Sequence, residues 1–366
     1  MNITMATYQS LLDSLNSIEK MKEISTLVTK PAEGASEDSP LLAKLMAESR
    51  VPWTDGGDLY EWNIVSAEKE AVVSDYRAAI THSEPEFLVK ATMKYVRYRA
   101  SAMYFIGEAM KQRSNKLGFA SYVARIMDDA LKGFGIRFDN EAFNLTADTS
   151  FTVAGTDALG RSMSADNHAV GLTTALEAYD QVGLSGTAAS PSGFYAGKTR
   201  SSSTGYLNNN AVYVPGGLAG LQKTHLERAI ALATHGSLGS PNLAILDDPQ
   251  YLKVKSLVAT ELKDSLAKDD FFNSLGYQNF VWSGVTWVAS KRITATTSAG
   301  KVTTARSRFE LLNTKHILLP VVPEEACTWR DPIILEGQDA IRRDAYFNFC
   351  LCVSNPRCHT VVYNLT

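Results

Sequence analysis

Four cysteines are the residues of this chain best suited to hold a metal ion. Cys350 and Cys352 stand two residues apart on an expected strand and would share one face of it, whereas Cys327 lies in a different element. No Cys-x-x-Cys pair accompanies them or Cys358, although structural zinc sites typically use that spacing. We therefore expect free, mostly buried thiols in a reducing compartment and no metal site.

Other motifs approach catalytic or phosphate-binding patterns without completing them. In Gly193-Phe-Tyr-Ala-Gly-Lys-Thr199 only three residues separate the first glycine from Gly-Lys-Thr, where a phosphate-binding loop needs four. Gly160-Arg-Ser-Met-Ser164 lacks the last glycine of a nucleophile elbow, and the six histidines show no tight metal spacing. Asp55-Gly-Gly-Asp58 is explained by a turn. We predict that the chain is not an enzyme and binds no cofactor.

A run of basic and aromatic residues allows two interpretations. The run contains Lys90, Lys94, Tyr95, Arg97, Tyr98 and Arg99. Aromatic rings that stack on bases, beside cations that meet phosphates, are typical of single-strand binding. The alternative is ion pairing with Glu61, Glu68 and Glu70 across a hairpin, or with acidic residues of an adjacent subunit. We favour ion pairing because the acidic partners are close in sequence.

Length and composition limit the class of protein. With 366 residues the chain exceeds one typical core, so two subdomains or long extensions are expected. Hydrophobic residues make up 45% and charged residues 20%, which is ordinary globular usage. No apolar run reaches the length of a spanning helix, and no signal-peptide pattern opens the chain. A net charge of −3 argues against a dedicated nucleic-acid binder.

Periodicity in the first half predicts an amphipathic helix, a projecting hairpin and a long helix. The amphipathic helix either packs on its own subunit's core or forms an arm that packs on a neighbour. Residues 7–29 have the apolar spacing of an amphipathic helix, and a short helix over 41–49 follows a polar linker. A strand over 58–65, a polar segment over 66–85 and a return strand over 87–101 form a hairpin too long to bury itself, so we expect it to contact a partner surface. A helix begins at Ser114 and either stops near Lys132 or continues bent through Phe143.

The second half alternates helices and strands. Residues 183–217 are rich in Gly, Ser and Thr and read as a long loop, after which a helix is expected over 218–235. A strand over 242–246 precedes a helix capped by Asp248, with Pro249 at its first position. We expect that helix to bury Leu252, Leu257, Val258 and Leu262. A hairpin over 279–288, strand-forming residues over 309–320 and closing strands over 346–365 complete the chain.

Three short motifs in this last region resemble the C-terminal half of tailed double-stranded DNA bacteriophage major capsid proteins. Gly284-Val285 stands in a strand-turn-strand element, Leu312-Asn313-Thr314-Lys315 in the next strand, and Asn355-Pro356-Arg357 at the closing strand. Asp248-Pro249, followed by Tyr251, is similar to the family's junction between its two domains.

The resemblance implies a mixed α+β chain with the Hong Kong ninety-seven capsid fold. Its expected parts are an N-terminal arm over 1–55 and an extended β-hairpin loop over 56–101. A peripheral domain with a long spine helix is expected over 102–239 and 340–366, and an axial domain, whose central sheet is flanked by helices, over 240–339.

The resemblance also implies shell building. Many copies would form pentamers and hexamers of an icosahedral head around packaged double-stranded DNA, assembled in the bacterial cytoplasm and retained in the virion. Expected partners are the chain itself, a portal protein, and scaffolding or decoration proteins, with non-specific contact to DNA and no membrane. The expected subunit-interface residues are Tyr60, Trp62, Lys69, Lys90, Lys94, Arg97 and Arg99. Two alternatives stay open, an encapsulin-like nanocompartment subunit with the same fold and a cytosolic enzyme of another class.

Overall fold

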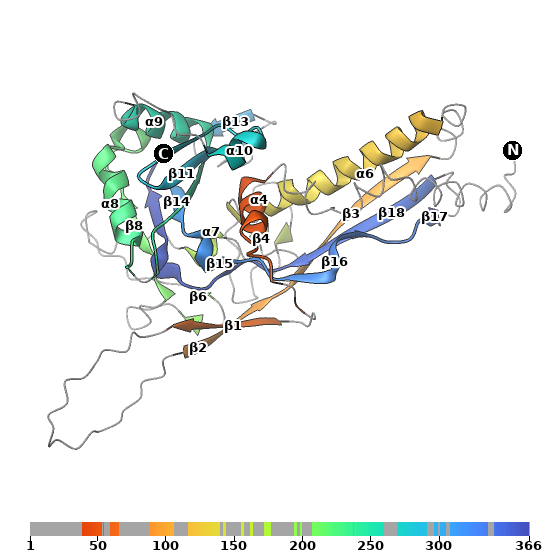
Figure 1. Cartoon of the computed structure of the whole chain (residues 1–366), viewed down its shortest axis with the longest axis horizontal. Coiled ribbons are helices and arrows are strands. Elements are labelled where there is room, and N and C mark those ends of the chain that lie inside the picture. The colour runs from red at the N-terminus through yellow and green to blue at the C-terminus, as the bar shows by residue number, and fades with distance from the viewer. Residues whose placement is uncertain are drawn as a thin grey trace, which may run out of the picture.

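The computed structural model combines two β-sheets, their covering helices and a projecting hairpin (Figure 1). It describes residues 39–52, 54, 59–65, 88–105, 116–139, 142–143, 155–156, 162–163, 172–176, 194–195, 198–199, 207–236, 238–259, 269–290, 296–298, 301–304, 308–335 and 340–365. The expected helix at 7–29, the hairpin tip at 66–85, the Asp55–Asp58 turn and the Ser114 cap lie outside these residues. The mixed α+β class predicted from the sequence is confirmed.

The larger sheet has six strands in the order β10-β11-β9-β14-β20-β8. These are β8 (Asn210–Tyr213), β9 (Leu243–Leu246), β10 (Asn279–Trp282), β11 (Val285–Ala289), β14 (Arg308–Leu312) and β20 (Thr360–Tyr363). β11 is parallel to β9 and β20 is parallel to β8, while the other neighbours are antiparallel. The predicted two-residue turn joins β10 to β11, and both Ser283 and Gly284 have the positive φ that such a turn requires.

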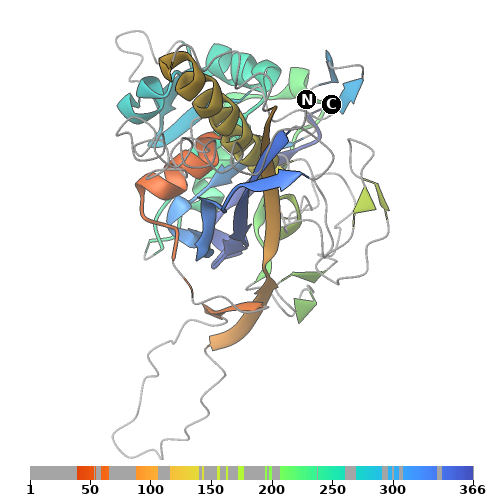
Figure 2. The ribbon, with the colours of Figure 1, turned by 90° about the vertical axis from the view of Figure 1, so that its right-hand side faces the viewer.

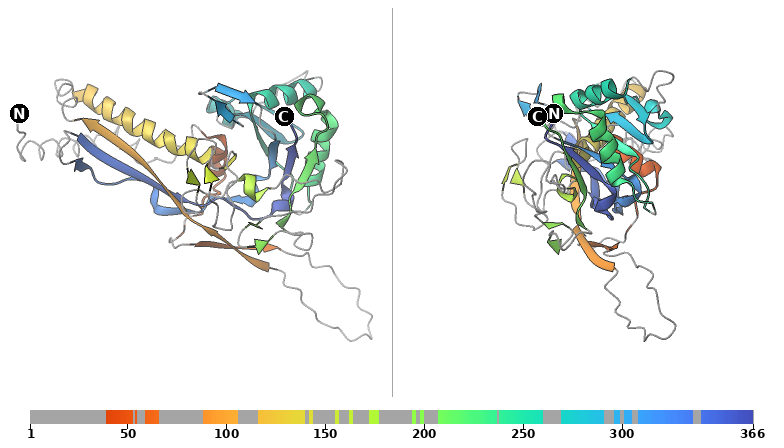
Figure 3. Two further views of the ribbon diagram at one scale, coloured as in Figure 1. Left: turned by 180° about the vertical axis from the view of Figure 1, so that it is seen from behind. Right: turned by 90° about the vertical axis from the view of Figure 1, so that its left-hand side faces the viewer.

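Both faces of this sheet are covered, which explains the uninterrupted apolar sequence of β9. Leu243 and Ile245 pack into the core shared with the smaller sheet, whereas Ala244 and Leu246 face a second core. Helices α8 (Lys223–Ala233) and α9 (Asp248–Val258) close that second core. Figure 3 shows them in green and teal along the outside of the sheet. A strand buried on both sides reads as a continuous apolar run, as β9 does.

Two details of α9 differ from the sequence prediction. The N-cap is Asp247, not Asp248, because the Asp247 side chain accepts a hydrogen bond from the backbone N–H of Gln250 (2.9 Å). The buried face holds Tyr251, Val254 and Val258, whereas Leu252 is 62% exposed. Val258 of the predicted stripe is buried, and Leu257 packs partly against the second core. The prediction was therefore wrong at Leu252, while Leu262 lies outside the described residues.

The smaller sheet has four strands and is called the spine sheet below. Its strands are β3 (Val96–Phe105), β16 (Val321–Trp329), β17 (Ile333–Leu335) and β18 (Ala340–Phe349). β18 pairs antiparallel with β3 along all ten residues and with β16 and β17 on its other side. The register of β16 shifts near Cys327, whose φ is positive, as at a β-bulge.

The long helix α6 (Lys116–Asp139) lies along this sheet (Figures 1 and 2). Its 24 residues correspond to about 36 Å. It continues through Gly133 and Gly135 because packing outweighs their cost of about 1 kcal/mol each. The Phe134 ring lies 5.8 Å from Phe347, and the Phe138 ring lies 5.5 Å from Phe349. The helix thus ends between the two predicted limits.

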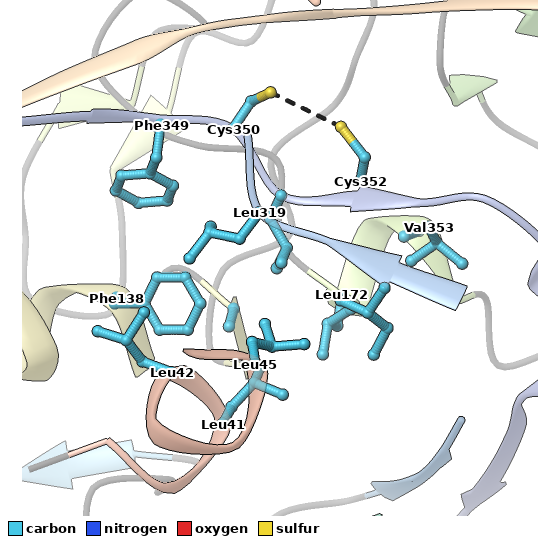
Figure 4. Close-up of a cluster of buried hydrophobic side chains, with 14 of the residues drawn as sticks. Leu41, Leu42, Leu45, Phe138, Leu172, Leu319, Phe349, Cys350, Cys352 and Val353 are labelled. Carbon is cyan, nitrogen blue, oxygen red and sulfur yellow. Dashed lines mark hydrogen bonds between the residues drawn. The ribbon is translucent and has the colours of Figure 1, made fainter. Parts of the chain in front are cut away.

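The short helix α4 (Pro40–Ala47), predicted over 41–49, packs within its own chain. Leu41, Leu42 and Leu45 are buried against Phe138, as Figure 4 shows. Ser39 caps α4 by accepting from the N–H of Leu42, and its hydroxyl donates to the buried carboxylate of Asp139 at the end of α6. This part of the expected arm is therefore tied to the spine helix of the same subunit.

The remaining elements are short. The projecting hairpin consists of β1 (Leu59–Val65) and β2 (Leu88–Lys94). Helices α7 (Leu172–Ala175) and α10 (Asp270–Ser274) contribute Leu172 and Phe272 to the shared core. Four two-stranded pairs are β4 (Gly155–Thr156) with β5 (Ser162–Met163), β6 (Phe194–Tyr195) with β7 (Lys198–Thr199), β12 (Thr296–Ser298) with β13 (Lys301–Thr304), and β15 (Ile317–Leu318) with β19 (Cys352–Val353). Three 3₁₀ turns are η3 (Leu218–Gly220), η4 (Thr314–His316) and η5 (Pro356–Cys358).

Sheet membership differs from the predicted domain boundaries. β8, α8 and β20, expected in the peripheral part, belong to the six-stranded sheet, whereas β16, expected in the axial part, pairs with β18. The chain crosses between the sheets several times, so no single late insertion separates them. The expected Leu312–Lys315 strand also stops at Leu312, because the Asn313 side chain accepts from the N–H of Lys315 and starts η4.

Candidate assembly surface

The hairpin β1–β2 is anchored at its base by apolar side chains at every second position of its strands. Its register pairs Trp62 with Ala91 and Val65 with Leu88. Trp62 and Ile64 are buried on the inner face, and the Tyr60 ring stacks on Trp62 with centroids 5.9 Å apart. Because successive side chains of a strand alternate between its two faces, β1 and β2 bury one face of the pair against the core. Figure 2 shows the pair at the lower end of the molecule.

The predicted interface residues of the hairpin differ in their exposure and in their contacts. Trp62 is only 8% exposed and packs within its own chain. Lys90 is exposed on the outer face, where its Nζ lies 2.7 Å from Oε2 of Glu61, so the predicted cross-strand ion pair is present. Lys94 ends β2 and is half-buried. Lys69 lies outside the described residues.

The predicted return strand is two strands, and the basic row is divided between them. β2 buries Ala91 and Met93, and Tyr95, which lies between the two strands, is buried on the same alternation. β3 buries Val96 and Tyr98, so the inward parity changes at Tyr95. β2 pairs with β1 of the hairpin, but β3 pairs with β18 of the spine. The two lysines of the row therefore belong to the hairpin and the two arginines to the spine sheet.

Arg97 belongs to a charged cluster within the chain on the outer face of the spine sheet. Its guanidinium lies over the ring of Tyr346 and pairs with the carboxylate of Glu325. Arg330 binds the same carboxylate at 3.0 Å and lies 5.0 Å from the same ring. Sequence reasoning missed these partners because they are more than 200 positions from Arg97. No local spacing could have connected them.

Arg99 differs from Arg97, although both point to the outer face of β3. Its side chain is exposed, and it has no ion-pair partner within the part of the chain that the structure describes. Its register neighbour is Tyr346, whose ring is already occupied by Arg97 and Arg330. The guanidinium of Arg99 is therefore exposed on this face and takes no part in the Glu325 cluster.

The far end of the same face is apolar. Met103 is 42% exposed, Phe105 47% and Ile333 45%. Met103 and Ile333 flank Arg342 of β18 in register, so the two side chains lie on one row across three strands. Large exposed apolar side chains gathered on one face are typical of an interaction surface.

The four thiols are buried. Burial raises the pKa of the Cys327 thiol to about 12 and that of Cys358 to about 11. The Sγ atoms of Cys350 and Cys352 lie 3.6 Å apart, and burial, followed by this contact, raises the pKa of Cys352 well above its usual value (Figure 4). Protonated, enclosed thiols are poor nucleophiles and ligands. Among the described residues no group of three or more potential ligands could hold a metal.

The segment 193–199, which nearly matches a phosphate-binding loop, contains the small hairpin β6–β7. β6 and β7 pair Phe194 with Thr199 and Tyr195 with Lys198, so the segment does not lead from a strand into a helix. Tyr195 is buried, and its hydroxyl accepts a hydrogen bond from the N–H of Val353. This bond joins the β6–β7 hairpin to β19.

In the described part of the chain no helix is both long and apolar enough to cross a membrane.

Solved capsid structures share this arrangement. The chain is similar to the Cyanophage A-1(L) capsid asymmetric unit, with a TM-score of 0.54 and 12% identity over 87% of this chain and 90% of that chain. It is similar to the satellite phage P4 procapsid that includes the size determination (Sid) protein, with a TM-score of 0.50 and 10% identity over 97% of each chain. For the capsid of the empty GTA particle the TM-score is 0.51, at 10% identity over 88% of this chain and 90% of that chain.

No protein-family model matches the sequence, and no curated protein matches it. The similarity is therefore one of fold. The chain has the Hong Kong ninety-seven-like fold of phage capsid proteins.

Proposed function

We propose that this chain is a major capsid subunit that assembles into pentamers and hexamers of an icosahedral head enclosing double-stranded DNA. The observation that carries the proposal is the hairpin β1–β2, whose strands pair only with each other in the described part of the chain. A two-stranded ribbon is marginal by itself and gains stability when a further surface packs against it. The similarity of the fold to capsid structures supports a neighbouring subunit as that surface.

Charge supports a specific mode of contact. Residues 66–86 of the hairpin contain five acidic side chains, Glu68, Glu70, Asp75, Glu84 and Glu86, against the two basic residues Lys69 and Arg77. The outer face of the spine sheet offers the exposed Arg99 and, farther along, the apolar row. We place the acidic hairpin of one copy over this face of the next. Such a head-to-tail contact closes into rings when the rotation between copies allows it.

The two sheets suggest the division of the subunit. The axial part in this proposal is the six-stranded sheet with α8 and α9, and the peripheral part is the spine sheet with α6. α4 and the region near Cys350 and Cys352 join the two, since both contribute to the shared core. Portal, scaffolding and decoration proteins, and non-specific contact with DNA in the virion, remain part of the proposal.

Electron microscopy and mass photometry of the expressed protein test the proposal. Closed shells, tubes or capsomers of megadalton mass are expected. A monodisperse species of 39.9 kDa at every salt concentration would refute shell building and favour the enzyme alternative. Particles that enclose a protein cargo, purified from a host without a portal or terminase, would favour the nanocompartment alternative over a DNA-filled head.

A further inference from the structure

A pocket of about 350 Å³ opens beside α9 at the edge strand of the six-stranded sheet. It is lined by Tyr251, Lys255, Asn273, Gly276, Tyr277, Gln278 and Asn279. Its walls come from α9, from the C-terminal end of α10 and from the start of β10. The volume lies at the lower end of the range for small-molecule sites, so the pocket suits one side chain or a small metabolite.

Two hydrogen-bond donors in this pocket are unused. Tyr251 is only 3% exposed, yet its hydroxyl has no hydrogen-bond partner within the described part of the chain. The ammonium of Lys255 makes no ion pair there and approaches only the Tyr251 ring, at 5.9 Å from its centroid. The Tyr251 oxygen is not among the fully enclosed unpartnered atoms of the described residues, so it faces the opening of the pocket. A ligand that accepts hydrogen bonds would therefore meet both donors.

The rest of the pocket is fixed by packing and internal hydrogen bonds. The Tyr251 ring packs 5.4 Å from the ring of Phe280 in the second core. The side chain of Asn279 accepts from the N–H of Asp269 (2.8 Å) and donates to the carbonyl of Tyr277 (3.1 Å). These bonds hold the turn after α10 against β10. The two free donors therefore sit on rigid elements, which reduces the entropy that a ligand must give up.

The donor set indicates the chemical class of the ligand. A single ammonium beside a phenol hydroxyl matches one negative charge with two acceptor atoms, which is the chemistry of a carboxylate. Phosphate sites usually add an arginine fork or several backbone N–H groups, and the lining residues include no arginine. We propose that this pocket binds a carboxylate, held by the ammonium of Lys255 and the hydroxyl of Tyr251. The aromatic ring of Tyr277 offers an apolar wall for the ligand's stem.

Calorimetric titration of the purified protein with glutarate tests the proposal. Wild type is expected to show saturable binding with one site per chain. Tyr251→Phe and Lys255→Gln should each weaken it by about tenfold, the effect of losing one hydrogen bond to a charged group. Lys253→Gln is the matched control, because Lys253 carries the same charge on the same helix but contacts the carbonyl of Ala219. The measurement applies to whatever oligomer the protein forms, so it is independent of shell assembly.

The carboxylate has two possible sources, a free molecule or an acidic side chain of another copy. Carbodiimide treatment of assembled particles, made from isotopically labelled and unlabelled chains, separates them. An amide between Lys255 of one copy and Asp or Glu of another identifies the protein source, and saturable glutarate binding without that amide identifies a free ligand. The proposal is overturned if neither is found, or if Lys253→Gln weakens glutarate binding as much as Lys255→Gln.

Discussion

The guanidinium of Arg97 lies 4.0 Å from the centroid of the Tyr346 ring on the neighbouring strand. Arg330 approaches the same ring, and both arginines bind Glu325. This cluster joins three strands that meet from distant parts of the chain, β3, β16 and β18. Two residues along β3, Arg99 points to the same face and takes no part in the cluster. Arg97 therefore acts within the subunit, and under the proposed function Arg99 is the arginine that contacts a neighbour.

Replacing the arginines one at a time should separate stability from assembly. Arg97→Glu loses a cation–π contact and an ion pair at a half-exposed site and faces Glu325, so we expect a loss of about 1 kcal/mol in the unfolding free energy. Arg99→Glu should change it by less than about 0.5 kcal/mol. Urea unfolding of dissociated subunits measures both.

We also predict that the Arg99→Glu variant assembles less well than the wild type. Light scattering should show slower and weaker particle formation, most clearly at low salt, where screening is least. A small loss at each contact is repeated over every copy of a closed shell. Shells of normal yield that fail only to retain DNA would instead support the nucleic-acid interpretation of the basic run.

His359 should make the subunit sensitive to acid. It is fully buried, and its Nδ1 accepts a hydrogen bond from the backbone N–H of Asn313. Burial, and then the nearby His316, lowers the pKa of His359 to about 3 from its usual 6.5. The folded state therefore binds fewer protons than the unfolded state between these values. Stability is full above pH 6.5 and falls as the pH drops toward 3, by about 2 kcal/mol at pH 5.

Urea midpoints measured at several pH values check this expectation. His359→Asn keeps an acceptor for the N–H of Asn313 but cannot take up a proton in this range. The variant should be less stable at pH 7 and should have a flatter dependence between pH 7 and pH 5, where few carboxylates titrate. Equal slopes for the two proteins would show that His359 does not control the acid response.

The sequence was most informative where pattern and partner lie close together. The β10–β11 hairpin was predictable because its alternation and its Ser283-Gly284 turn fall within ten residues. The pairing of β3 with β18 was not, since neither strand's own residues specify a partner more than 200 positions away. The break at Tyr95 did leave a local signal. The adjacent apolar residues Tyr95 and Val96 change the phase of the alternation, which a single strand would not do.

The buried face of α9 predicts losses of stability of different size for two nearby truncations. Val254 is fully buried in the second core, so Val254→Ala should cost about 2 kcal/mol for the lost methyl groups and the cavity they leave. Leu252 is 62% exposed, and Leu252→Ala should change stability by less than about 0.5 kcal/mol. Thermal or urea unfolding measures the pair. A larger loss for Leu252→Ala would restore the face that the sequence alone suggested.

Deleting residues 66–84 tests whether the hairpin serves the subunit or its neighbour. The register pair Val65 and Leu88 would remain, joined through Pro85, Glu86 and Phe87, and the anchoring side chains Trp62 and Ile64 lie outside the deletion. We therefore expect a folded subunit whose urea midpoint changes little, because the removed segment is polar and the anchoring side chains remain. Assembly should fail or yield only small oligomers by mass photometry, because the proposed contact with the next subunit is lost. An unfolded product would place residues 66–84 in the intrachain core, and normal shells would show that the spine sheet meets its neighbours without the hairpin.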